Sequence, residues 1–401
     1  MSTIKLFRED VYKTEVNAQV VEFLPETGAV RLDRTIFFPG GGGQSHDRGT
    51  IGGFSITGSY EEGEDIFHIV DGQLKEGEEV VCLLDWAHRF DNMQRHCGEH
   101  ILSGMFYREY RGINRGFHMG EDYMTIDISL EESEKYDVLT YDMAIHAQNC
   151  TNQAIWENLP VETRLFPTGE EAENLPLRKS LAIEDNVSIV CVGDPKNASD
   201  CVACCGTHPS TSGQVGLLKV YKVEKNKGMF RVYFEAGARA MADYEEKHNI
   251  ILDLGKKYSA GKDDLLQKIT AQEARNSTTR ERFATLRRSV TDRRVGEISA
   301  ALDEKKDDFL VYEYDDMSVD DALPIGRQVA DKVGKLLVLT IPAENTLLLF
   351  SDGTVHCGKL VKENASIYNG KGGGSDTNAR AIFPGKDGMM TFIDLLEKHL
   401  R

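Results

Sequence analysis

Two pairs of potential metal ligands, far apart in the chain, place the strongest constraint on its fold. His96 and His100 stand four residues apart in the stretch 93–105, whose apolar residues recur at helical spacing, so both imidazoles lie on one face of a predicted helix. Cys204 and His208 repeat this spacing. Imidazole and thiolate ligands suit Zn²⁺. The two pairs together therefore predict one zinc site, which the fold must assemble from both segments.

The role of such a site is open at this point. Four protein ligands are typical of a closed structural site, whereas a catalytic zinc keeps a position free or expands its coordination. His96, Glu99 and His100 also spell the His-x-x-Glu-His pattern of inverzincin metalloproteases, in which the glutamate is the general base. That interpretation leaves Cys204 and His208 unused. Otherwise Glu99 is a second-sphere carboxylate that orients a neighbouring ligand.

The composition is that of a globular protein of several domains. The chain has 401 residues, 40% of them apolar and 28% charged, which predicts two or three domains. It has neither an apolar run of about 20 residues nor a signal peptide at its start, so we expect a cytoplasmic protein with no membrane partner. The eight cysteines follow no framework spacing, so the cluster at 201–205 indicates metal or thiolate chemistry before disulfides.

The net charge of −18 does not exclude nucleic acid, because binding depends on a local patch. One segment, 275–294, is strongly basic. Its acidic residues are Glu281 and Asp292, against seven arginines: Arg275, Arg280, Arg282, Arg287, Arg288, Arg293 and Arg294.

Residues 1–85 alternate short β-rich runs with turns, which predicts a small N-terminal β-barrel. The expected strands are 19–24, 29–32, 51–56, 66–70 and 79–84. Within this domain four consecutive glycines, 40–43, precede Gln44. A glycine run does not stabilise a strand; it suits either a flexible loop or a turn whose backbone amides approach a polar group.

Residues 86–236 mix helices and strands around the predicted zinc ligands, which indicates an α+β domain. The histidine helix should run from about 85 to 107, and a second helix from 136 to 158. The expected strands are 123–129, 161–166, 187–192 and 215–220.

The remaining residues predict two further parts. Apolar residues recur at spacings of three and four from 237 to 258, a turn follows, and a second long helix should reach about 302, so 237–305 is expected to be a coiled-coil-like helical hairpin. Residues 306–401 predict a small α/β domain. Its glycine segment, 370–374, resembles a phosphate-binding loop but lacks the P-loop order, so ATP binding is not expected.

Three motifs of the first two domains resemble one known family. They are 32–39 with Gly41, Gly42, Gly43, Gln44 and Asp47; then His96-x-x-x-His100; then the run from Cys204 to His208. In this order they resemble the editing module of alanyl-tRNA synthetases and the free-standing AlaX editing proteins. The glycines at 370–374 resemble a motif in the C-terminal domain of those synthetases. Cys205 departs from the family, which usually has glycine there, and places a thiol beside the site.

The resemblance implies the site chemistry. His96, His100, Cys204 and His208 would hold Zn²⁺, and Thr35 and Gln44 would line the catalytic pocket and recognise a serine hydroxyl. Gly41, Gly42 and Gly43 would contact the substrate. Arg108, Arg111 and Arg115 would take tRNA phosphates, unless they only form a solvated surface.

The resemblance also implies the reaction, which is trans-editing: zinc-dependent hydrolysis of the ester in tRNA(Ala) misacylated with serine or glycine. The predicted β-barrel begins almost at Met1, so we expect no aminoacylation domain. The helical hairpin and the C-terminal domain would form a homodimer or carry tRNA. The alternative from another class is a non-catalytic, zinc-stabilised RNA-binding or assembly protein.

Overall fold

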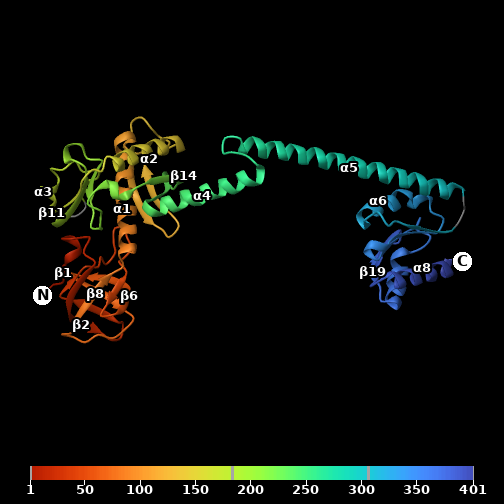
Figure 1. Ribbon diagram of the computed structural model, residues 1–401, viewed down its shortest axis with the longest axis horizontal. Helices are drawn as coiled ribbons and strands as arrows, with labels where there is room; N and C mark the ends of the chain where they lie inside the picture. The colour runs from red at the N-terminus through yellow and green to blue at the C-terminus, as the bar shows by residue number, and fades with distance from the viewer. Residues whose placement is uncertain (1, 182–184, 305–307, 401) are drawn as a thin grey trace. The chain divides into compact units, whose positions relative to one another are not determined.

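The computed structural model describes residues 2–181, 185–304 and 308–400. The chain forms two compact units, Met1–Asp253 and Leu254–Arg401, which are described separately (Figure 1). Helices and strands are mixed throughout, so the predicted α+β class is confirmed. Among the described residues, none of the helices combines the length and apolar character that a membrane crossing needs.

A barrel forms the N-terminal part of the first unit. Its strands follow the order β2-β3-β7-β6-β5-β8, and β8 closes back onto β2. On β8 every second residue is buried, so Val80 and Cys82 face the core. The strands are β2 (Glu15–Leu24), β3 (Ala29–Leu32), β5 (Gly49–Ile51), β6 (Phe54–Glu62), β7 (Asp65–Val70) and β8 (Glu79–Leu84). A short ladder joins β1 (Ile4–Lys5) to β4 (Arg34–Thr35).

One predicted strand in the barrel was wrong. The run 51–56 is not continuous, because Gly52 and Gly53 both have positive φ and form a two-residue turn. Ile51 pairs with Phe54 across this turn. Two successive residues at positive φ match the tight hairpin turns that favour glycine.

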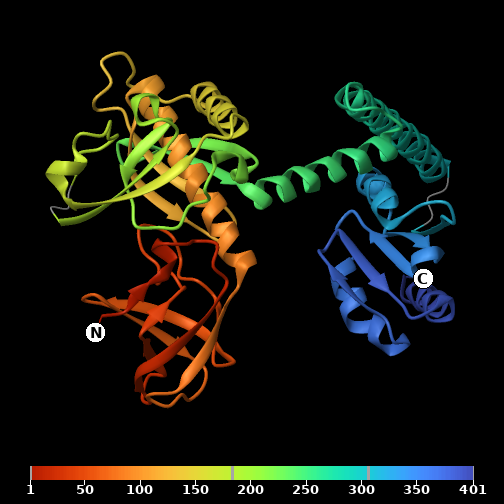
Figure 2. The same cartoon turned by 60° about the vertical axis from the view of Figure 1, so that its left-hand side comes forward.

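Helix α1 (Trp86–Tyr110) leads from the barrel to the sheets of the first unit (Figure 2). Asp85 caps its first turn by accepting a hydrogen bond from the backbone N–H of His88, and Arg111 ends it in the left-handed conformation. Helix α2 (Tyr141–Trp156) shares a hydrophobic core with α1 and with the sheet β14-β15-β10-β9. These strands are β9 (Ile113–Met119), β10 (Met124–Ser129), β14 (Leu218–Asn226) and β15 (Met229–Ala236).

A second sheet of this unit carries the cysteine cluster. Its order is β11 (Val161–Thr168), β12 (Asp185–Val192) and β13 (Asp200–Ala203), with the short helix α3 (Gly169–Ala172) after β11. Cys191 and Cys201 are paired across β12 and β13 and form a disulfide. The sequence indicated metal or thiolate chemistry for the whole cluster, and this expectation was wrong for Cys201, because strand pairing places it opposite Cys191.

Two long helices follow, α4 (Gly237–Tyr258) and α5 (Leu265–Glu304), as predicted. The boundary between the units falls within α4, so the packing of α4 against α5 as a hairpin stays a prediction. The predicted domain boundary at 305 and 306 lies outside the described residues. The boundaries at 85 and 236 also remain predictions.

The C-terminal part of the second unit is a mixed sheet with helices. The sheet order is β16-β17-β18-β20-β19, and β16 runs parallel to β17. The elements are β16 (Phe309–Glu313), α6 (Val319–Val329), β17 (Leu336–Ile341), β18 (Thr346–Phe350), α7 (Cys357–Asn364), β19 (Lys371–Gly374), β20 (Asn378–Ile382) and α8 (Lys386–Leu400). Short 3-10 turns lie at Leu6–Arg8, Pro195–Asn197, Ser212–Val215, Ala330–Lys332, Pro342–Glu344 and Ala365–Tyr368.

The glycine segment of this unit is a strand, not the phosphate-binding loop that its composition suggested. Lys371–Gly374 forms β19 and pairs with β20. A side chain at Gly358 on α7 would collide with the backbone of Gly374. Gly358 is therefore needed for close packing of α7 against β19. The loop conformation expected for 370–374 was wrong, and phosphate binding by this segment stays a prediction.

Candidate metal centre and its pocket

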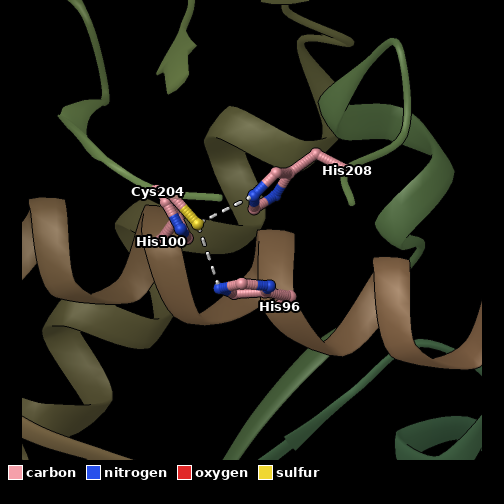
Figure 3. A group of neighbouring side chains, drawn as sticks. All are labelled: His96, His100, Cys204 and His208. Carbon is pink, nitrogen blue, oxygen red and sulfur yellow. Dashed lines mark hydrogen bonds between the residues drawn. The ribbon is translucent and has the colours of Figure 1, made fainter. Parts of the chain in front are cut away.

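The structure brings the four predicted ligands together. His96 and His100 project from α1, Cys204 follows β13, and His208 lies in the next loop (Figure 3). One ligand atom from each residue lies within 4.8 Å of all the others. The Sγ atom of Cys204 is 3.5 Å from Nε2 of His96 and 3.4 Å from Nε2 of His208.

These distances fit a tetrahedral zinc ion. Bonds of about 2.3 Å to sulfur and about 2.0 Å to nitrogen set the sulfur and nitrogen of a tetrahedral site roughly 3.5 Å apart. The two measured separations from the sulfur agree with this value. The donor set of one thiolate and three imidazoles also suits zinc. The residues therefore fit the ion that the sequence predicted.

Buried polar groups behind the ligands orient two of the imidazoles. Oε1 of Gln44 lies 2.8 Å from Nδ1 of His96, which places the proton on that nitrogen and leaves the Nε2 lone pair facing the cluster. Oδ2 of Asp200 lies 3.2 Å from Nδ1 of His100, without the alignment of a regular hydrogen bond. Arg178 holds Asp200 through Nε at 2.7 Å.

Gln44 also contacts the loop that carries His208. Its Oε1 accepts the backbone N–H of Thr207 at 3.1 Å, and its Nε2 donates to Oγ1 of the same threonine at 2.8 Å. Gln44 therefore joins the glycine motif, the histidine helix and the cysteine segment. The third imidazole is less constrained, because Nδ1 of His208 has no hydrogen-bond partner among the described residues.

The protonation of the cluster follows from its burial and its mixed charges. Burial alone disfavours a thiolate, but the surrounding His96, His100 and His208 outweigh this and lower the pKa of Cys204 well below its usual value. Burial also disfavours a charged imidazole, but the Cys204 thiolate and Asp200 raise the pKa of His100 to about 10. At His208, burial and the charge of His96 lower the pKa to about 4. The cluster thus favours the thiolate that zinc requires.

The glycine motif has a defined conformation. All four residues of 40–43 have positive φ, and Gly41 and Gln44 exchange backbone hydrogen bonds of 3.0 Å. A side chain at Gly43 would collide with the ring of Phe117. The run is therefore a turn that places Gln44 against the metal ligands, and this resolves the alternative of a flexible loop.

Asp47, four residues after the turn, is fully buried and paired with fully buried Arg89. Its Oδ2 accepts the backbone N–H of Phe38 at 2.6 Å. This pair joins the glycine segment to the first turn of α1 and fixes the approach of the barrel to the metal ligands.

A cavity of about 340 Å³ opens beside the ligands. Among the predicted site residues, those that line it are Gly42, His96, Glu99, His100, Arg115, Cys204 and Cys205. Arg8, Asn114, Phe117, Arg178 and Lys179 also contribute to the wall, and the sequence interpretation missed them. Asn114 and Phe117 lie on β9, and Arg178 and Lys179 are neighbours in a loop, but none of the five belongs to a motif, so no spacing pattern indicated them.

Thr35 lies elsewhere. Its side chain is fully buried in the barrel, where Oγ1 lies 2.9 Å from Nε2 of His68, and it is not part of the cavity lining. His68 is held on its other side by Ser59, with 2.8 Å between Oγ and Nδ1. The structure thus places Thr35 in a polar network inside the barrel.

The three predicted arginines are separated from one another. Arg115 lines the cavity and is ion-paired with Glu131. Arg108 pairs with its neighbour Glu109, and Arg111 stacks over the ring of Tyr107 at the end of α1. Only Arg115 of the three is therefore placed to meet a molecule in the cavity.

A second group of potential ligands, Glu109, His146 and Cys150, lies on α1 and α2. Nε2 of His146 is 3.5 Å from Oε2 of Glu109 and 3.7 Å from Sγ of Cys150. The group has only three members and does not line the cavity. It is a useful comparison for metal binding at the four-ligand centre.

Comparisons with known proteins identify relatives of this chain. Residues 187–233, which include Cys204 and His208, match the family model described as "Threonyl and Alanyl tRNA synthetase second additional domain". The chain is 30% identical to the alanyl-tRNA editing protein AlaX-L of Pyrococcus horikoshii, over 94% of this chain and 93% of the relative.

Two further relatives are matched over part of their length. The alanyl-tRNA editing protein Aarsd1 of Danio rerio is 29% identical, over 59% of this chain and 55% of the relative. An alanine–tRNA ligase of Pyrobaculum arsenaticum is 26% identical over 99% of this chain, but the match covers 44% of the ligase.

Proposed function

Because this chain belongs to the AlaX family of alanyl-tRNA editing proteins, we propose that it is a trans-editing hydrolase that deacylates mischarged tRNA(Ala). The observation that carries the proposal is the convergence of four metal ligands, His96, His100, Cys204 and His208, of which the first three also line one cavity. The geometry favours this reaction over the inverzincin interpretation, because Cys204 and His208 complete the ligand set that the protease pattern leaves unused.

In this proposal the four side chains hold Zn²⁺. The bound ion supplies Lewis acidity for ester hydrolysis or positions the acylated 3′ end of the tRNA. Gln44 fixes the tautomer and orientation of His96 through a hydrogen bond. Asp200, held by Arg178, faces Nδ1 of His100 at 3.2 Å and stabilises its position by charge. Arg178 and Asp200 are thereby positioning residues.

We propose serine as the amino acid that is removed, with the smaller glycine as a second substrate. A site that bonds a hydroxyl can reject an analogue that lacks it. Thr35 and Gln44 were the expected hydroxyl-binding groups, but their side chains are occupied by His68, His96 and Thr207. We therefore assign Gln44 to positioning the ligands, and Thr35 to supporting the barrel.

For the tRNA we propose that cations at the cavity bind backbone phosphates. Arg115, Arg178 and Lys179 line the wall, and Nη1 of buried Arg178 has no hydrogen-bond partner among the described residues. Measurement of tRNA affinity against salt tests this assignment. Arg115→Ala should flatten the salt slope by about one unit, whereas Arg108→Ala, outside the cavity, should leave it unchanged.

We propose that the long helices and the C-terminal domain form a dimer surface. On α5 the apolar side chains Phe283, Leu286 and Val290 recur at helical spacing and are exposed. Sedimentation of the full chain should show a dimer that Phe283→Asp weakens. A monomer at every concentration would contradict this proposal and leave tRNA binding as the role of these helices.

The experiment that tests the function is deacylation of Ser-tRNA(Ala), Gly-tRNA(Ala) and Ala-tRNA(Ala) by the purified protein. We expect selective loss of serine or glycine by the native chain and no activity of Cys204→Ala. Circular dichroism shows whether the variant is folded. If the folded, zinc-loaded native protein hydrolyses none of these esters, the proposal fails, and a zinc-stabilised RNA-binding protein becomes the better interpretation.

A further inference from the structure

Glu99 lies on the same face of α1 as the two histidine ligands. Four polar side chains lie along one side of α1, because they are spaced three or four residues apart or next to such a pair. They are His96, Glu99, His100 and Ser103. Glu99 is only 4% exposed, yet it lines the cavity beside the metal centre. Its carboxylate is thus withdrawn from bulk solvent and turned toward the substrate space.

Only one of the two carboxylate oxygens of Glu99 accepts hydrogen bonds from described residues. Oε1 accepts hydrogen bonds from Oγ of Ser103 at 2.5 Å and from Nδ2 of Asn114 at 2.7 Å. Oε2 has no hydrogen-bond partner within the described part of the chain, and no described lysine or arginine forms an ion pair with Glu99. Arg178, Lys179 and His100 attract this carboxylate at longer range, but none of them contacts it. A buried carboxylate oxygen without a direct partner is costly, so Oε2 is suited to a cationic ligand group.

The charged side chains of the cavity wall are suited to two different groups of a ligand, one anionic and one cationic. Among the described residues that line the cavity, Glu99 is the one carboxylate, and the cations are Arg8, Arg115, Arg178 and Lys179. The other buried carboxylate nearby, Asp200, is already engaged by Arg178 and His100. The cations suit phosphate oxygens, and Glu99 suits a positive group next to the metal centre.

We propose that Oε2 of Glu99 binds the α-ammonium group of the amino acid esterified to the tRNA. This inference rests on the proposed function and adds the substrate class: aminoacyl esters with a free amine. The ammonium is separated from the ester carbonyl by one carbon atom, so its attachment at Glu99, adjacent to His100, directs the carbonyl toward the metal ligands. An ester with a blocked amine, such as a peptidyl ester, loses the charge and is rejected.

The test compares kcat/KM for Ser-tRNA(Ala) and N-acetyl-Ser-tRNA(Ala). The native chain should prefer the free amine by about ten- to hundredfold, as expected for a hydrogen bond to a charged group. Glu99→Gln keeps the shape and the acceptor for Ser103 and Asn114 but removes the charge. The Glu99→Gln variant should lose most of the preference for the free amine, because its kcat/KM should fall for Ser-tRNA(Ala) and stay unchanged for N-acetyl-Ser-tRNA(Ala). Glu132→Gln, an exposed site outside the cavity, is the matched control and should keep the preference.

Equal losses on both esters in Glu99→Gln would show a merely structural role and overturn the inference, as would a native chain without preference. A binding measurement separates failure of the ammonium site from failure of the proposed hydrolase function. It compares the affinities of a non-hydrolysable 3′-seryl-amido adenosine and of its N-acetyl form. If no ester is hydrolysed but Glu99→Gln selectively weakens binding of the free-amine analogue by about tenfold or more, the ammonium site stands and the hydrolase does not. If the native chain binds both analogues equally, the ammonium site is refuted.

Discussion

Removal of the Gln44 side chain should weaken zinc binding although Gln44 is not a ligand. In Gln44→Ala three buried hydrogen bonds are lost: those of Oε1 with Nδ1 of His96 and with the N–H of Thr207, and that of Nε2 with Oγ1 of Thr207. The imidazole of His96 is then free to rotate or to change tautomer. Loss of such an outer partner typically lowers metal affinity 10–100-fold, or about 1.4–2.8 kcal/mol.

The same substitution should also lower the stability of the metal-free protein. The N–H groups of His96 and Thr207 are left buried without a partner, and each such group costs about 1–3 kcal/mol. We expect a total loss of about 2–4 kcal/mol in the free energy of unfolding, since some relaxation or water entry offsets part of the cost.

Competition with a chelator of known affinity measures the first effect, and denaturant unfolding of the zinc-free chain measures the second. Gln44→Glu is the matched variant, because its carboxylate still accepts from His96 and from Thr207, so its zinc affinity should stay within a few-fold of the native value. If Gln44→Ala bound zinc as tightly as the native chain, the claim that Gln44 orients His96 would be refuted.

Three other predictions test the centre and the barrel. Elemental analysis should find one zinc ion in each native chain, none in Cys204→Ala and one in His146→Ala. If the native chain held two zinc ions and His146→Ala held one, the second ligand group would also be a metal site. Burial and then the charge of His46 lower the pKa of His68 from 6.5 to about 3, so its contribution to stability is present above about pH 6.5 and is lost as the pH falls toward 3. The native chain should therefore lose about 2 kcal/mol more between pH 7 and pH 5 than His68→Gln, and equal losses in urea unfolding would exclude this role. Asp47→Asn leaves buried Arg89 without its counterion and should cost about 3–5 kcal/mol in urea unfolding; a loss below about 1 kcal/mol would show that the pair does not hold the glycine turn.

The sequence alone determined the elements whose signals are local. The apolar period of α1 and the alternation of β8 follow from side-chain directions that repeat within a few residues, so both were placed correctly. The four metal ligands were also identifiable, because spacing of four and ligand chemistry are properties of short segments. The glycine run at 52–53 was misjudged, since a turn interrupts an otherwise β-like composition there.

Only the tertiary structure decided which further residues join the site. Arg178 and Asp200 reach His100 from other segments, and neither belongs to a motif, because their roles depend on contacts between residues distant in the chain. Thr35, chosen as a pocket residue by resemblance, is instead buried against His68. Local spacing fixes what a residue can do chemically, whereas the packing of distant elements fixes which groups surround it, and a pocket depends on both.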